Sequence, residues 1–124
     1  MSLQVDLKLD GELLLAVVKG TVSTVDETWR ILKQICDTAL EKHLNRILID
    51  WLGTQGVTTT FDRYHIGAKM VTYCGDHKLW PTLALVGQPP VVDGFGGLVA
   101  KNRWLVTETF PSRKEALVWL AHRT

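Results

Sequence analysis

The length, composition and charge of this chain define a narrow class of protein. With 124 residues, of which 46% are hydrophobic and 22% charged, it has room for one packed domain spanning residues 1–124. Its 14 basic and 13 acidic residues give a formal net charge of +1, which argues against binding to nucleic acid or to an anionic membrane. No segment resembles a signal peptide or a membrane span, so we expect a cytoplasmic protein.

The chain begins with a predicted β-hairpin. Residues 3–9 alternate between apolar and polar side chains, and residues 13–18 form a continuous apolar run. The dipeptide Asp10-Gly11 between them is typical of a hairpin turn. We therefore expect a half-exposed strand paired with a buried one, and a break in the pattern at Gly20.

A helix follows the hairpin. Thr24 and Glu27 fit a capping box, which predicts a helix that begins there and ends near His43. Apolar residues recur along it at helical spacing. The expected buried stripe consists of Val25, Trp29, Leu32, Cys36 and Ala39, widened by Ile31, Ile35 and Leu40.

A short buried strand and a second helix come next. Residues 47–49 predict a strand ending at Asp50 and Trp51, followed by a loop with two glycines. Either Thr59 together with Asp62, or Thr60 alone, can cap the next helix. The loop glycines are Gly53 and Gly56, and the expected buried stripe of the helix is Phe61, Tyr64, Ala68 and Val71.

The remaining elements complete an alternating order. Residues 82–86 predict a buried strand, Asp93 can cap a short third helix, residues 104–110 predict the last strand, and Ser112 starts a helix ending near His122. The apolar residues expected to face inward are Phe95, Leu98 and Val99 in the third helix, and Ala116, Leu117 and Leu120 in the last.

The order ββαβαβαβα predicts an α/β protein with a mixed five-stranded sheet and helices packed on its faces. In open sheets of this kind, ligands bind in a crevice outside the carboxyl ends of the parallel strands. The segments that we expect at this edge are residues 50–53, 58–60, 87–90 and 93–94.

Three stretches carry a family resemblance: residues 45–50, residues 82–87, and residues 103–110 with 115–120. Together with the element order, they resemble STAS-like domains of the SpoIIAA-like branch, which are related to bacterial anti-sigma-factor antagonists and share a fold with CRAL-TRIO lipid-transfer domains. The resemblance implies a STAS-like fold and a role in binding a protein partner.

The resemblance also implies a regulatory site at the start of the second helix. In antagonists of that family, a Ser in an Asp-Ser-Ser-Gly turn at this place is phosphorylated, and Asp50 matches their strand-end Asp. Here residues 57–62 read Val-Thr-Thr-Thr-Phe-Asp, with no Ser or Gly in register. Thr59 and Thr60 are therefore candidate phosphoacceptors, and plain N-capping is the alternative role of these hydroxyls.

Further candidate residues lie at strand ends. Asp50 is expected to hydrogen-bond loop amides rather than act as a catalytic acid. Tryptophans at strand ends often line a pocket or an interface. The residues expected to bind a ligand or a partner are Asp50, Trp51, Thr58, Thr59, Thr60, Trp80 and Asp93.

Catalytic and metal-binding motifs are not recognisable, so we predict no metal, no cofactor and no enzymatic activity. The four histidines lack ligand spacing. We expect Cys36 and Cys74 to be buried free thiols, as in proteins of a reducing compartment. A disulfide between them is the less favoured alternative. An enzyme would require one cleft containing Asp50, Asp62, Arg63 and His65.

Two functional hypotheses follow. The first is a non-enzymatic regulatory module that binds a protein partner or a second copy of itself, with Trp51, Trp80 and an exposed face of the second helix as anchors. The second is binding of a small apolar or lipid-like molecule at the carboxyl ends of the strands, as the kinship with CRAL-TRIO domains implies.

Overall fold

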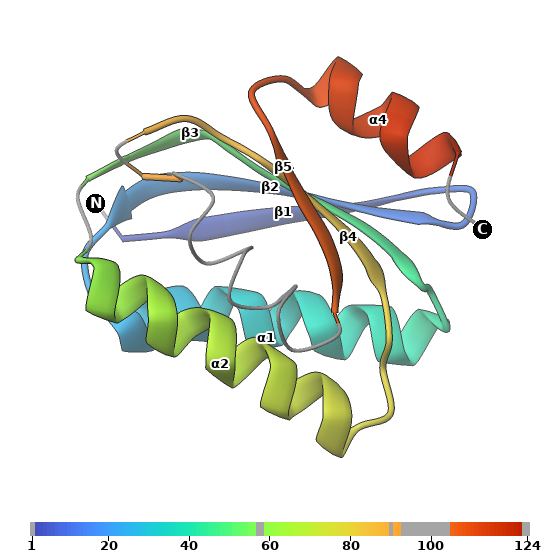
Figure 1. The fold of residues 1–124 in the computed structure, drawn as a ribbon, viewed down its shortest axis with the longest axis horizontal. Coiled ribbons are helices and arrows are strands. Elements are labelled where there is room, and N and C mark those ends of the chain that lie inside the picture. The colour runs from blue at the N-terminus through green and yellow to red at the C-terminus, as the bar shows by residue number, and fades with distance from the viewer. Residues whose placement is uncertain (1, 57–58, 90, 93–104, 123–124) are drawn as a thin grey trace.

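A mixed β-sheet lies between two layers of helices (Figure 1). The computed structural model describes residues 2–56, 59–89, 91–92 and 105–122. Helices α1 (Val25–Lys42) and α2 (Thr60–Asp76) lie on one face, and α4 (Arg113–Ala121) lies on the other. The strands are β1 (Gln4–Asp10), β2 (Leu13–Val22), β3 (Arg46–Gly56), β4 (Thr82–Val86) and β5 (Val106–Phe110). The predicted α/β class with a mixed five-stranded sheet is confirmed.

The sheet order is sequential, β1-β2-β3-β4-β5. Strand β1 is antiparallel to β2 through the predicted Asp10-Gly11 turn, in which Gly11 has a φ of 60°, and the other pairs are parallel. Because the order never reverses, the sheet has no topological switch point of the kind that opens a crevice in doubly wound folds. The carboxyl ends of the parallel strands nevertheless carry a groove, described below.

Strands β2 and β3 are longer than predicted. The sequence predicted a break at Gly20 and a loop after Trp51, yet β2 continues to Val22 and β3 to Gly56, paired in parallel to the end. Gly20 and Gly56 have φ values of 116° and 121°, and a β-carbon would collide with the carbonyl oxygen of Ser2 or of Val22, respectively. These glycines permit a close backbone approach within the sheet instead of ending the strands.

Each face of the sheet has its own apolar cluster. Along β3, Ile47 and Ile49 face α1 and α2 in the larger cluster, while Leu48 faces α4 in the smaller one. Helix α1 buries most of its predicted stripe, centred on Ile31 and Ile35. Such alternation along a central strand is expected when helices cover both faces.

Local capping follows the predicted residues. The Oγ1 of Thr24 accepts a hydrogen bond from the backbone N–H of Glu27 (3.1 Å), and Ser112 caps α4 in the same way. The Glu27 carboxylate does not complete a capping box; it accepts a hydrogen bond from the backbone N–H of Leu3 (2.9 Å) and so ties the start of β1 to α1.

The predicted inward face of α2 is partly wrong. Phe61 and Tyr64 are 68% and 40% exposed, and the buried residues are Gly67, Met70 and Cys74. The predicted stripe lies on one apolar side of α2, but a neighbouring side of the helix, which carries Gly67, Met70 and Cys74, packs against the core. A periodic pattern shows that a helix has apolar sides, but when there are two of them it does not show which one packs against the rest of the protein.

The final segment of the chain agrees with prediction in part. Ala116 and Leu120 of α4 are buried as predicted, but Leu117 is exposed, because the short helix contacts the sheet through one narrow side. The third helix predicted after Asp93, with Phe95, Leu98 and Val99, lies outside the described residues, as does Trp104. No helix in the described part of the chain is long and apolar enough to cross a bilayer.

Aromatic and charged side chains connect α1 to α2. The hydroxyl of Tyr73 donates to Oδ1 of Asp37, and Trp29 packs edge-to-face on the Tyr73 ring, with centroids 5.5 Å apart. The hydrogen bond to Asp37, followed by desolvation, raises the pKa of Tyr73 from 10.0 to about 12.

This contact predicts a loss of stability at alkaline pH. Between pH 10 and 12 the native state holds the Tyr73 proton more tightly than the unfolded chain does, so the contribution is complete below pH 10 and vanishes as the pH rises through 12. We expect Tyr73→Phe to lower the free energy of unfolding by about 1 kcal/mol at pH 8. In urea titrations this difference should shrink by pH 12; a difference that stays constant with pH would contradict the assignment.

Candidate functional site

The carboxyl half of β3 departs from the regular sheet directly after Asp50. Val17 pairs with Asp50 and Lys19 pairs with Gly53, so β3 contains one more residue than β2 over this interval, which is a β-bulge. Polar groups within and next to the bulge form hydrogen bonds with nearby residues of β3. Oδ1 of Asp50 accepts the backbone N–H of Leu52 (2.8 Å), as predicted for Asp50, and the Thr54 hydroxyl donates to the Trp51 carbonyl (2.6 Å).

The second carboxylate oxygen of Asp50 is held by α4. Arg113 donates to Oδ2 of Asp50 from Nη2 at 2.6 Å and from Nε at 3.1 Å, while Asp50 itself is only 4% exposed. The pair lies on the α4 face of the sheet and joins the first turn of that helix to the bulge. A cation in the first turn of a helix interacts unfavourably with the helix dipole. The position of Arg113 in the sequence was therefore a sign that its side chain has an acidic partner elsewhere.

A groove of about 420 Å³ runs beside the bulged half of β3. It exists because β4 pairs with β3 only as far as Asp50 and Val86, while β3 continues to Gly56. Beyond Val86 the chain no longer pairs with β3: the N–H of Gly87 donates to the carbonyl oxygen of Phe110 (3.0 Å), and the N–H of Val92 donates to the carbonyl oxygen of Gln88 (3.1 Å). The lining residues are Trp51, Leu52, Thr54, Gln55, Gly56, Gln88, Pro89 and Val91.

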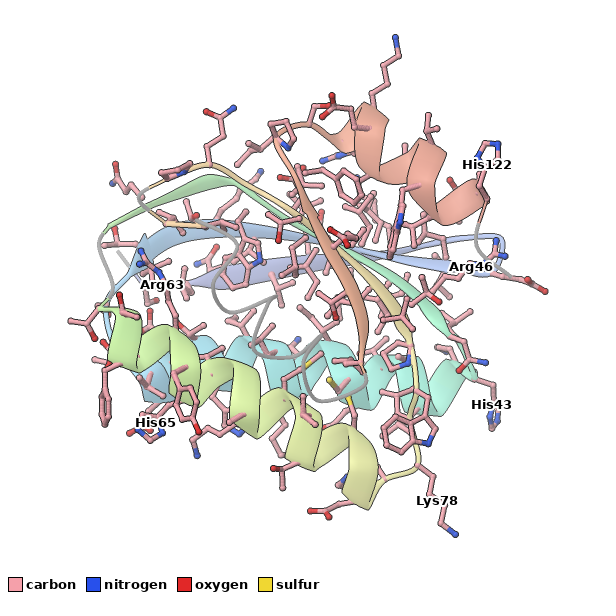
Figure 2. All side chains as sticks on the ribbon, in the orientation of Figure 1. His43, Arg46, Arg63, His65, Lys78 and His122 are labelled. Carbon is pink, nitrogen blue, oxygen red and sulfur yellow. The ribbon has the colours of Figure 1, made fainter. Side chains whose placement is uncertain are left out.

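The start of α2 presents an aromatic cluster to solvent. The ring of His65 lies edge-to-face against Phe61 (4.3 Å between centroids) and against Tyr64 (5.7 Å). Figure 2 shows His65 on the side of α2 that points away from the sheet, and Arg63 on the side toward it. We call Phe61, Tyr64 and His65 the α2 aromatic cluster.

The threonines at the start of α2 are exposed, and one of them caps the helix. Oγ1 of Thr59 accepts the backbone N–H of Asp62 at 3.0 Å, which settles the capping residue as Thr59. Thr60 is the first residue of α2 and is also exposed. Thr58 and Asp93, both predicted to belong to the site, lie outside the described residues.

The structure does not gather the predicted site residues in one place. The Asp50 carboxylate faces α4, whereas Trp51 belongs to the cluster facing α1 and α2, where it is 8% exposed. Trp80 is 58% exposed, but it precedes β4 and so lies at the amino end of a strand whose other end neighbours Asp50. Trp80 therefore lies at the opposite end of β4 from Asp50, so the two residues do not form one site.

The residues that an enzyme would need are also separated. Asp50 is paired with Arg113 on the face opposite α2, and His65 is packed between aromatic rings on the outside of that helix. Figure 2 shows His43, His65 and His122 at three different corners of the molecule. Within the described residues, no group of three His, Cys, Asp or Glu side chains could hold a metal ion.

The Asp50–Arg113 pair predicts unequal effects of its two single substitutions. Arg113→Gln leaves a buried carboxylate with one N–H donor, whereas Asp50→Asn leaves a guanidinium whose side chain is 43% exposed and can be hydrated. We expect losses of about 2 and about 1 kcal/mol, and a double variant that loses less than the sum. Urea unfolding measures all three.

Lys114→Gln serves as the matched control, because Lys114 is the exposed cation next to Arg113; its effect should stay within about 0.5 kcal/mol. Strictly additive losses from the two single substitutions would show that the pair does not stabilise the fold.

Solved structures provide the comparison with known proteins. No protein family profile matches the chain, and no curated protein does either. An anti-sigma factor antagonist from Mycobacterium paratuberculosis superposes with a TM-score of 0.66 at 15% identity, over 97% of this chain and 95% of that one. The anti-sigma factor antagonist SpoIIAA in its unphosphorylated form superposes with a TM-score of 0.55 at 10% identity, over 99% and 100%. The chain therefore has the fold of these anti-sigma factor antagonists.

Proposed function

We propose that this protein is a non-enzymatic regulatory module that binds a protein partner, or a second copy of itself, through the start of α2. The observation that carries the proposal is the exposure of Phe61 and Tyr64, two large aromatic side chains within one helical turn. Exposed aromatic residues are the usual anchors of protein interfaces.

The geometry of the α2 aromatic cluster supports this role. Edge-to-face contacts with His65 already order the rings of Phe61 and Tyr64, so binding sacrifices less side-chain entropy than it would with mobile anchors. Phe61 lies near the carboxyl edge of the sheet, because α2 follows directly from the long β3. The fold likeness to two anti-sigma factor antagonists supports a partner that is itself a regulatory protein. We place this activity in the cytoplasm.

Regulation by modification forms part of the proposal. Thr59 is engaged as the N-cap, which leaves Thr60 as the better placed phosphoacceptor among the described threonines of the α2 start. A phosphate there would be stabilised by the helix dipole and would add negative charge one residue from Phe61.

Site-specific photo-crosslinking in cells tests the proposal. A photoreactive phenylalanine analogue at position 61 should capture one main species, either a second copy of the chain or one partner protein. With that species purified, Phe61→Ser should weaken binding by about 30-fold, as expected for an aromatic anchor. Thr60→Glu should also weaken it, through charge next to the interface.

Val118 provides the matched control, because it is 56% exposed on α4, on the other face of the sheet. Val118→Ser should change binding by less than about twofold. Equal capture from positions 61 and 118, or an unchanged affinity of Phe61→Ser, would refute a binding role of the α2 start.

A second candidate function is the binding of a small apolar or lipid-like molecule in the groove. The volume of the groove, about 420 Å³, falls within the range of roughly 300–1,000 Å³ typical of ligand pockets, and Trp51, Leu52 and Val91 give it apolar walls. A fold kinship with CRAL-TRIO domains would favour this function. Native mass spectrometry of protein purified from cells should then show a bound organic molecule, and a spectrum of the bare chain alone would exclude it.

A further inference from the structure

Three sulfur atoms meet in the core between α1 and α2. Cys36 comes from α1, and Met70 and Cys74 lie one helical turn apart on α2. The Cys36 thiol donates to Sδ of Met70 at 3.5 Å. All three side chains are buried, and both cysteines are free thiols with no exposed surface, so the predicted burial of the two cysteines is confirmed.

The two thiols also interact with each other and differ in acidity. Interaction with Cys74, aided by burial, raises the pKa of Cys36, and interaction with Cys36 lowers the pKa of Cys74. Cys74 therefore carries the larger share of thiolate, which is the nucleophilic form of cysteine. Cys36 contacts Met70, which lies one helical turn from Cys74, so the two thiols are neighbours, and the more acidic one suits the attacking role and the other the resolving role.

We propose that Cys36 and Cys74 form a redox-active dithiol that hydrogen peroxide closes to a disulfide between α1 and α2. The Cys74 thiolate attacks one peroxide oxygen, so that an S–O bond forms, the O–O bond breaks and hydroxide leaves. The sulfur of Cys36 then attacks the resulting sulfenic acid; an S–S bond forms, the S–O bond breaks, and water leaves with the Cys36 proton. The dithiol is oxidised and peroxide is reduced.

The surroundings favour a disulfide over a metal-thiolate complex. A disulfide is neutral, and its burial in the apolar cluster of α1 and α2 carries no charge penalty. Two thiolates around a soft monovalent cation would leave a net negative charge in that cluster, which is costly. The proposal does not rest on the proposed function.

The disulfide would restrain α2. Gly67, Met70 and Cys74 are its buried residues, and Ile66, Val71 and Tyr73 pack partly against the same cluster. Peroxide would reach the thiols through local opening of this helix. A covalent link to α1 would fix the helix that presents the α2 aromatic cluster. Closing the loop between the two cysteines should raise the melting temperature by roughly 10 °C.

Peroxide treatment of the native full-length chain tests the proposal. We expect intact mass to show the loss of two hydrogen atoms, thiol titration in denaturant to fall from two to none, and peptide mapping to join the Cys36 and Cys74 peptides within one chain. The melting temperature should rise, and dithiothreitol should reverse the rise.

Variants assign the two roles. In Cys36→Ala, Cys74 should stop at the sulfenic acid, which dimedone traps; in Cys74→Ala, Cys36 should react about tenfold more slowly. Met70→Leu keeps both thiols and a similar volume, so it should form the disulfide at a rate within about twofold of the parent. Peptide mapping of the parent and of Met70→Leu decides the outcome even if an alanine variant fails to fold.

Three results would overturn the proposal. These are two thiols that survive peroxide in the native state but react in denaturant, disulfides that form only between chains, and oxidation confined to methionine sulfoxide or sulfinic acid.

Discussion

Strand β3 pairs with β2 along its whole length but with β4 only as far as Asp50, and most features of the molecule depend on this mismatch. Its first half is a central strand buried on both faces. Its second half lacks a strand partner on one side among the described residues, and the groove runs along that side. The transition is fixed by a buried carboxylate, because Asp50 satisfies Leu52 inside the bulge and is itself held by Arg113.

In this arrangement, the residues that hold the fold together differ from the residues that are exposed to solvent. Asp50 and Trp51 are consecutive residues of one strand, so their side chains point to opposite faces. Asp50 forms an ion pair, and Trp51 packs in the larger core cluster and also lines the groove. Several large apolar side chains remain exposed elsewhere, among them Phe61 and Tyr64 at the start of α2. Exposed aromatic side chains of this kind suit the binding role proposed above.

Sequence patterns predicted those parts of the fold that depend on local interactions. The turn at Gly11 and the caps at Thr24 and Ser112 involve residues a few positions apart and were predicted correctly. For α2, the observed cap Thr59 was one of two predicted alternatives. The element order and the resemblance led to the α/β class with a mixed sheet.

Features that depend on contacts between distant segments were missed. Gly20 and Gly56 resembled strand breaks because the carbonyl groups that approach them come from other parts of the chain. The side of α2 that packs on the sheet and the Arg113 partner of Asp50 are likewise tertiary properties. The groove lies at the carboxyl edge of the strands, and the unequal lengths of β3 and β4 that produce it were not predicted.

Native-state hydrogen exchange along β3 tests the central claim most directly. If the strand is paired on both sides up to Asp50 and on one side beyond it, the amides of Ile47–Ile49 should all exchange slowly. From Gly53 to Gly56, slow amides facing β2 should then alternate with fast amides facing the groove. Uniformly slow exchange through Gly56 would mean that the outer half of β3 has a second strand partner, and it would contradict this account of the groove.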